Sequence, residues 1–164
     1  MLFKRAIALV GLLATSILAQ APGSLLAPAE VEKRLPATVY YAGQTAPTQL
    51  RNSGGVKFAD GHYVLAALVD TSGYSSGVAS KYQGYLITEV ALEIGENTLP
   101  AGAYGIGFIP GDKFVVTDLG GSDVFTARAA TDAALARPRP LQLTADPAGG
   151  FRIYSGRAYI QFRR

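Results

Sequence analysis

The chain has 164 residues, no cysteine, no tryptophan and one histidine, and it carries 15 basic and 12 acidic side chains. The missing cysteines exclude disulfides and closed zinc sites, so a chain of this length must obtain its stability from an apolar core. The sequence also contains no complete nucleotide loop or metal-ligand set, and no cofactor is expected.

Residues 1–19 have the three parts of a cleavable signal peptide: a cationic start, an apolar stretch over 6–18 and small residues after it. The apolar stretch is shorter than the roughly 20 residues that span a bilayer as a permanent helix. Cleavage is expected after Ala19 or Ala21, and Ala19 is preferred because Pro22 would hinder the second cut. The sequence thus predicts an exported, periplasmic or extracellular bacterial protein with no membrane span after cleavage.

Charge argues against nucleic acid as a partner. Cleavage would remove Lys4 and Arg5, leaving 13 basic against 12 acidic side chains, without the clustered cations that neutralise phosphates. The remaining asymmetry is local, since residues 128–164 contain seven arginines against Asp132 and Asp146. These arginines either lie scattered in solvent or form one basic face, for which an acidic ligand is one interpretation.

Residues 20–36 are expected to form a linker and one short helix, ahead of a single β-rich domain over 37–164. The helix is predicted over 29–35, because acidic residues precede basic ones there and prolines flank the segment. We expect this helix to be peripheral to the core.

From residue 38 onward, short apolar or alternating runs separated by glycine-rich turns predict strands. The predicted strands are 38–42, 56–58, 62–70, 85–94, 103–109, 113–119, 123–127, 141–145, 151–155 and 158–162. The expected fold class is all-β: a single antiparallel β-sandwich or partly open barrel with one or two short peripheral helices.

Turn chemistry predicts how several strands connect. Residues 110–112 (Pro-Gly-Asp) indicate the clearest hairpin, because proline presets the first turn torsion and glycine accepts positive φ. Similar turns at 146–150 and 156–157 predict an antiparallel meander of the last three strands. The run 130–137 has a cap-type residue and high helix propensity, and it predicts one or two turns of helix before Pro138.

A Gly-x-Ser-x-Gly motif occurs at residues 73–77, after an apolar strand, where a hydrolase nucleophile elbow would place Ser75. Such an elbow requires a following helix and a later histidine, whereas 77–84 is polar and loop-like and His62 comes earlier. Hydrolysis at Ser75 is therefore a remote alternative to a flexible loop. His62 is expected to be an ordinary strand residue, and no catalytic residue is assigned.

Asp118 and Asp123 are weak calcium candidates, because two carboxylates and turn oxygens lie in a glycine loop between them. Calcium takes roughly six to eight oxygen ligands, and this segment lacks an obvious full set. An ordinary hairpin turn is preferred, and no metal site is assigned.

Residues 70–85 form a long polar segment between two strong strands, and long segments on rigid β scaffolds often carry binding residues. Tyr74, Lys81, Tyr82 and Tyr85 are its candidate ligand-binding residues, because tyrosine can stack on a sugar or an apolar group while its hydroxyl makes a hydrogen bond. The alternative is an ordinary connection.

The motif Leu-Pro-Ala-Gly-Ala-Tyr at 99–104, followed by 108–111 and 114–116, resembles small uncharacterised secreted bacterial β-sandwich proteins. The resemblance covers about residues 84–162. It rests on turn and strand residues, so it implies fold and export and transfers no activity or site.

The leading functional hypothesis is an exported soluble binding or accessory module, with a small molecule, a glycan or an envelope protein as its partner. The alternative is a self-assembling structural protein of the cell surface, favoured by many tyrosines and by exposed strand edges.

Overall fold

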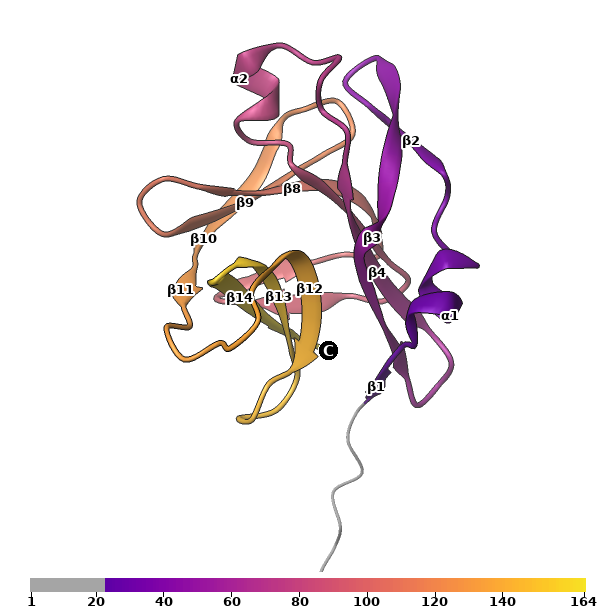
Figure 1. Ribbon diagram of the computed structural model, residues 1–164, viewed down its shortest axis with the longest axis vertical. Coiled ribbons are helices and arrows are strands. Elements are labelled where there is room, and N and C mark those ends of the chain that lie inside the picture. The colour runs from indigo at the N-terminus through magenta and orange to yellow at the C-terminus, as the bar shows by residue number, and fades with distance from the viewer. Residues whose placement is uncertain (1–22) are drawn as a thin grey trace, which may run out of the picture.

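The computed structural model describes residues 23–164. Two packed antiparallel sheets make up most of this part of the chain (Figure 1), which confirms the predicted all-β sandwich. The predicted signal peptide, 1–19, lies outside the described residues. Within 23–164, no helix has the length and apolar character that a membrane crossing requires.

The first sheet has eight strands in the order β1–β3–β4–β5–β8–β9–β10, and β2 pairs with β3. Its strands are β1 (Gly23–Leu25), β2 (Thr38–Tyr41), β3 (Gln44–Phe58), β4 (Tyr63–Val69), β5 (Gly84–Thr88), β8 (Gly102–Ile109), β9 (Lys113–Thr117) and β10 (Asp123–Arg128). The strand β3 is much longer than the predicted 56–58, and its register with β4 shifts between Gln49 and Ser53.

The second sheet has six strands in the order β12–β13–β14–β6–β7, and β11 pairs with β14. Its strands are β6 (Leu92–Ile94), β7 (Asn97–Leu99), β11 (Ala130–Thr131), β12 (Arg139–Ala145), β13 (Phe151–Gly156) and β14 (Ala158–Arg163). The antiparallel meander predicted for the last three long strands is confirmed.

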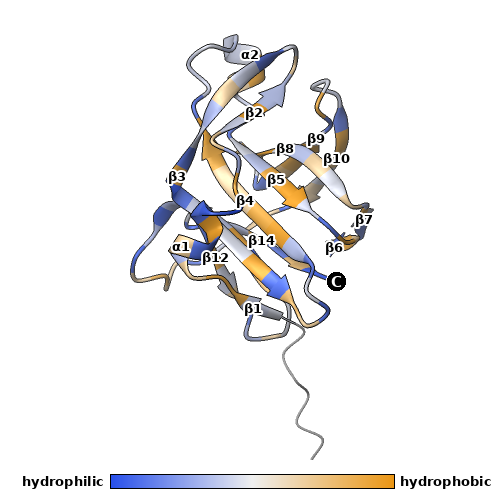
Figure 2. Ribbon diagram, turned by 90° about the vertical axis from the view of Figure 1, so that its right-hand side faces the viewer, coloured by the Kyte–Doolittle hydropathy of each residue, from blue (hydrophilic) through white to orange (hydrophobic). Residues whose placement is uncertain are grey.

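The core lies between the two sheets and receives apolar side chains from both. Phe58 of the first sheet meets Phe151 of the second edge-on, with ring centroids 6.2 Å apart. Fully buried core residues include Val56, Val64, Leu86, Phe114 and Val116 from the first sheet and Leu92, Ile94, Leu99, Ile153 and Phe162 from the second. Figure 2 shows the hydrophobic residues that run along β4 and β5.

The predicted hairpin at 110–112 joins β8 to β9, and Phe108 lies opposite Phe114. Gly111 and Asp112 both have positive φ, 85° and 54°. Glycine adopts this conformation readily, and aspartate is among the few other residues that tolerate it, so the local sequence specifies the turn.

The prediction of one continuous strand over 85–94 is wrong. The chain leaves the first sheet after β5 and enters the second as β6, with a turn at 89–91 between them. The Thr88 hydroxyl donates to the Val90 carbonyl at 2.6 Å and accepts from the Val90 N–H at 3.3 Å. This local side-chain bonding replaces the ladder hydrogen bonds that would have continued the strand.

The predicted helix at 130–137 is also wrong. Ala130 and Thr131 form β11, opposite Tyr159 and Ala158 of β14, and the chain then turns. Asp132 directs this turn, because its side chain accepts from the Ala134 N–H at 3.1 Å while its own N–H donates to the Arg157 carbonyl. Tertiary hydrogen bonds here override the helix propensity of the alanines.

Two short helices complete the described chain. The helix α1 (Pro28–Glu32) lies within the region where a helix was predicted, and it packs Val31, together with the following Leu35, against Leu65 and Ala67 of β4. The helix α2 (Ser76–Ala79) was not predicted, because its sequence is rich in serine and glycine.

Candidate functional site

The candidate tyrosines of segment 70–85 converge on one another and on Tyr41 of β2. Tyr41 and Tyr82 stack with ring centroids 3.7 Å apart, and Tyr74 meets the Tyr82 ring edge-on at 5.3 Å. The Tyr74 hydroxyl donates to the backbone carbonyl of Tyr41 at 3.1 Å. Tyr82 and Tyr85 are buried, so neither ring is available to stack on a ligand in this structure.

Tyr82 is the most enclosed member of this aromatic cluster. Its hydroxyl is buried and has no hydrogen-bond partner among residues 23–164. Burial raises the pKa of Tyr82 well above its ordinary value of 10, because the phenolate would lose its solvation. The Tyr41 hydroxyl, by contrast, is hydrogen-bonded to the Thr117 hydroxyl at 2.8 Å.

Segment 70–85 is anchored along its length. Lys81 forms an ion pair with Asp123 of β10 at 2.8 Å. The Gln83 side chain accepts from the Phe108 N–H at 3.0 Å and donates to the Phe108 carbonyl at 2.9 Å, as a neighbouring strand would. The segment expected to be a flexible loop therefore docks on β8 and β10.

Both calcium candidates, Asp118 and Asp123, make contacts within the protein. One Asp118 carboxylate oxygen accepts from the Ser122 N–H at 2.9 Å and closes the turn between β9 and β10. Asp123 is held by Lys81. Among the described residues, no group of three or more histidine, aspartate or glutamate side chains is placed to hold a metal ion.

Ser75 is the N-cap of α2, and its hydroxyl accepts from the Val78 N–H at 3.4 Å. His62 precedes β4 and Ser75 follows it, and a strand of this length separates its two ends by about 20 Å. His62 therefore does not serve Ser75 as a base in this structure, and the hydrolase hypothesis gains no support.

The structure instead has a cavity of about 280 Å³ between the end of α1 and the outer face of the first sheet. Leu65 and Ile87 are direct cross-strand partners on β4 and β5 and form its apolar floor. One position further along the same face lie Tyr63 and Glu89, where the Tyr63 N–H donates to the Glu89 carboxylate at 2.8 Å. Arg34 completes the lining.

Arg34 is positioned by three contacts. Its guanidinium lies over the Tyr63 ring, 4.7 Å from the centroid, and donates to the Tyr63 hydroxyl at 3.3 Å. Glu30 of α1 accepts from the same guanidinium at 2.6 Å, and this hydrogen bond raises the pKa of Arg34. A cation, a carboxylate and an apolar floor thus meet in one cavity.

A second cavity, of about 500 Å³, shares Glu89 with the first. It lies where the chain passes from the first sheet to the second, and its lining is mostly polar. The lining residues are His62, Glu89, Val90, Ala91, Leu92, Glu93, Thr98 and Arg164. The two cavities adjoin at this shared residue, and we call them together the Glu89 groove, with the first cavity as its apolar end and the second as its polar end.

Asp60 organises the polar end of the Glu89 groove. It pairs with the His62 Nδ1 atom at 3.0 Å and with the Arg164 guanidinium. The hydrogen bond from Arg164 is the main reason that the pKa of Asp60 falls to about 2, and the His62 N–H adds to the effect. Asp60 therefore stays ionised at any ordinary pH. Because Asp60 contacts the Nδ1 atom of His62, the Nε2 atom of the ring remains available for other contacts.

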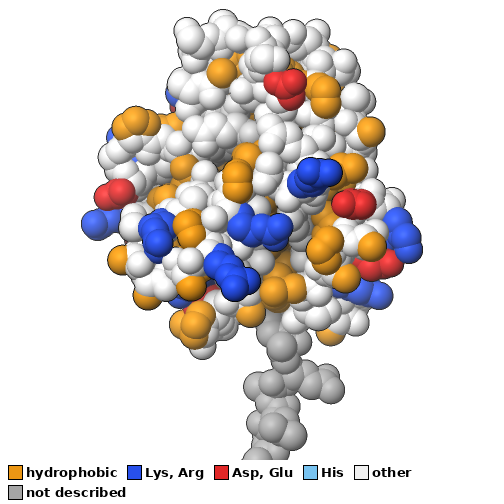
Figure 3. Space-filling view, in the orientation of Figure 1, with side chains coloured by type: hydrophobic (Ala, Val, Ile, Leu, Met, Phe, Trp, Pro, Cys, Tyr) orange, Lys and Arg blue, Asp and Glu red, His pale blue; other side chains and the backbone are white. Residues whose placement is uncertain are grey.

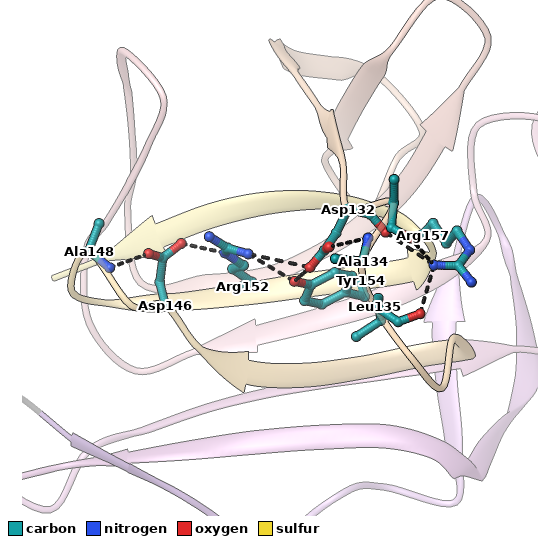
Figure 4. Close-up of polar contacts among 9 residues, drawn as sticks. Asp132, Ala134, Leu135, Asp146, Ala148, Arg152, Tyr154 and Arg157 are labelled. Carbon is teal, nitrogen blue, oxygen red and sulfur yellow. Dashed lines mark hydrogen bonds and ion pairs between the residues drawn. The ribbon is translucent and has the colours of Figure 1, made fainter.

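A polar network crosses the second sheet on the side away from the core (Figure 4). Arg152 of β13 pairs with Asp146 at 2.5 Å and lies 3.7 Å from Asp132. The Tyr154 hydroxyl donates to Asp132 at 2.9 Å and accepts from Arg152 at 3.0 Å. The Arg152 guanidinium also lies over the Tyr159 ring, 4.3 Å from the centroid.

Arg152 sets the charge state of this network. Burial alone would raise the pKa of Asp146, but the hydrogen bonds from Arg152 and from the Ala148 N–H outweigh it and hold the pKa below its ordinary value. Asp146 in turn raises the pKa of Arg152. Both groups are therefore ionised, and the network ties the turn at 146–150 to β13 and to Asp132.

The Glu89 groove was missed by sequence reasoning, although part of its signal was present. Tyr63 and Leu65 share one strand face, and Ile87 and Glu89 share another, so alternation places each pair together. This alternation does not predict the register in which β4 pairs with β5, nor the position of the Arg34 guanidinium over the Tyr63 ring. Comparison of the chain with protein-family models, curated proteins and solved structures found no significant match.

Proposed function

We propose that the protein is an exported binding module that holds a small ligand in the Glu89 groove. The sequence pattern of residues 1–19 supports export, and the sandwich supplies a rigid support for the groove. The observation that carries the proposal is that two cavities share Glu89, one with an apolar floor and one with polar walls. The volume of the first cavity, about 280 Å³, lies just below the roughly 300–1,000 Å³ range of small-molecule sites, and that of the second, about 500 Å³, lies within it.

The chemistry of the groove favours a ligand with both an apolar group and charged groups. The floor of Leu65 and Ile87 suits an aliphatic group, Arg34 suits a carboxylate, and the free oxygen of Glu89 suits an ammonium group. A short peptide or an amino acid derivative combines these groups. A neutral sugar would leave the apolar floor unused.

Thermal unfolding with named probes tests the proposal. Leucyl-leucine, which carries an aliphatic side chain and both charges, is expected to raise the Tm in a concentration-dependent manner, because binding to the folded state stabilises it. N-acetylleucinamide, which lacks both charges, is expected to give a smaller shift, and maltose is expected to give none.

Two charge-removing variants, Arg34→Gln and Glu89→Gln, are expected to weaken leucyl-leucine binding about tenfold each. Glutamine at position 89 can still accept from the Tyr63 N–H, so the strand pairing is retained. The matched controls are Lys33→Gln and Glu96→Gln, which remove the same charges outside the cavities. Equal effects of all four variants, or no shift with leucyl-leucine, would rule out this site.

A further inference from the structure

The arginines of residues 128–164 divide into two groups. Arg152, Arg163 and Arg164 form ion pairs with carboxylates. The other four make no ion pair with any carboxylate of residues 23–164, and all four are exposed: Arg128, Arg137, Arg139 and Arg157. Three of these four lie on neighbouring backbone segments at one corner of the second sheet.

Strand register and hydrogen bonds place the three together. Arg139 of β12 lies opposite Gly156 of β13, next in sequence to Arg157. One nitrogen of the Arg157 guanidinium, Nη1, donates to the carbonyls of Ala133 and Leu135 at 2.9 and 2.7 Å (Figure 4). Arg137 follows Leu135 by two residues. We call Arg137, Arg139 and Arg157 the basic corner.

No carboxylate of the described residues pairs with the basic corner, and one of its three guanidinium groups is held in place. Because Arg157 uses Nη1 to hold the turn, its guanidinium is fixed while Nε and Nη2 stay available as donors. The carboxylate of the same turn, Asp132, is already engaged by Arg152 and Tyr154. Figure 3 shows basic side chains gathered on the face that carries β12 and β14.

We propose that the basic corner binds an acidic polysaccharide through its carboxylate groups. All seven cations of residues 114–164 are arginines, and no lysine occurs there. Arginine presents a planar pair of donors that matches a carboxylate, which a lysine ammonium does not. Three exposed guanidinium groups close together, one of them fixed by the turn, suit a polymer that repeats such carboxylates.

Two other polyanions fit the corner less well. An anionic membrane surface favours basic residues accompanied by an apolar anchor, but the large exposed apolar side chains, Leu25, Tyr40 and Val124, lie on β1, β2 and β10. Single-stranded nucleic acid requires exposed rings for base stacking, whereas Tyr154 is buried and Arg152 covers Tyr159.

Affinity electrophoresis in gels that contain polygalacturonate tests the proposal. The wild-type protein is expected to be retarded at low salt and released as salt rises, because added ions screen the contacts. The variant Arg137→Gln/Arg139→Gln is expected to bind about tenfold more weakly. Neither side chain makes a hydrogen bond or ion pair within the described residues, so an unchanged Tm would show that this variant folds.

The control Lys33→Gln/Lys113→Gln removes the same charge from exposed positions just after α1 and on β9, and it is expected to bind as the wild type does. Equal weakening of the two double variants would overturn the proposal in favour of a net-charge effect. Retention on phosphatidylglycerol vesicles without retardation by polygalacturonate would also overturn it, as would no retardation at all. The Glu89→Gln variant is expected to be retarded normally, which separates the corner from the groove.

Discussion

Arg152 shows how one side chain makes several polar groups compatible with a buried position. Its side chain is 19% exposed and that of Asp146 only 2% exposed. A carboxylate so deeply buried is unfavourable without a partner, and the guanidinium provides one while it also contacts Tyr154 and Tyr159. The stability of the whole C-terminal meander therefore depends strongly on this residue.

Arg152→Met is expected to lower the free energy of unfolding by about 3 kcal/mol, because it leaves the buried Asp146 carboxylate without a cation. Urea unfolding measures the loss. The double variant Arg152→Met/Asp146→Asn is expected to recover part of it, since the asparagine oxygen can still accept from the Ala148 N–H. A double variant less stable than Arg152→Met would contradict this account.

The pH dependence of the same pair has a definite sign. In the wild type the pKa of Asp146 is lower when folded than when unfolded, so its contribution is present above about pH 4 and is lost as the pH falls through the folded pKa. In Arg152→Met, burial would raise that pKa, and stability would fall as the pH rises above about 4. The difference between the two proteins should be largest near neutral pH and shrink on acidification, and an opposite trend would exclude Asp146 as its source.

Tyr82 and Tyr41 allow a matched comparison of two buried hydroxyls. Tyr82→Phe removes a hydroxyl without a partner in residues 23–164, so the free energy of unfolding is expected to stay the same or to rise by up to about 1 kcal/mol. Tyr41→Phe removes the bond to Thr117 and is expected to cost about 1 kcal/mol. A larger loss for Tyr82→Phe would show that its hydroxyl has a role that the cluster does not explain.

Among the elements, the segment that contains α2 is held unusually close to β8. A Cβ atom built on Gly107 would lie 2.0 Å from the Lys81 carbonyl oxygen, closer than any real contact. The Gln83 side chain then pairs with Phe108. The absence of a side chain at one position of β8 therefore allows the whole segment to dock.

Gly107→Ala is expected to displace residues 78–83 and to lower the free energy of unfolding by about 2 kcal/mol or more. Gly77→Ala is the control, because Gly77 lies in α2 with open space around it and alanine favours helix there. It should leave stability unchanged or raise it. Thermal unfolding measures the Tm of the two variants, and an equal Tm would exclude tight docking of residues 78–83 on β8.

Local sequence signals predicted some elements well and others poorly. The turn at 110–112 and the final meander follow from proline, glycine and alternation, so they were predicted correctly. The prediction of a helix at 130–137 was wrong. Arg157 and Tyr154, which are distant in sequence, supply the hydrogen bonds that decide the conformation of this segment. The groove depends in the same way on Arg34 meeting Tyr63, a contact that no local pattern encodes.

For the whole molecule, both sheets share one core, so they should unfold together. Phe162→Ala, at a fully buried position of β14, is expected to cost about 3–5 kcal/mol. Tyrosine fluorescence reports mainly the first sheet and the segment 70–85, which hold seven of the nine tyrosines, and far-UV circular dichroism reports all strands. Coincident transitions are expected in both proteins, and a separate early loss of one signal in Phe162→Ala would show that the sheets are independent.

The crossing at 89–91 places β6 beside β14, so that Ile94 from the middle of the chain pairs with Phe162 near its C-terminal end. Since β14 is also the strand that connects β13 to β6, the second sheet stays in two pieces until this strand is in place. Contacts between such distant parts of a chain form slowly, because a long loop must close first. During synthesis from the N-terminus, the second sheet would thus stay incomplete, with an edge of β6 unpaired, until β14 emerged.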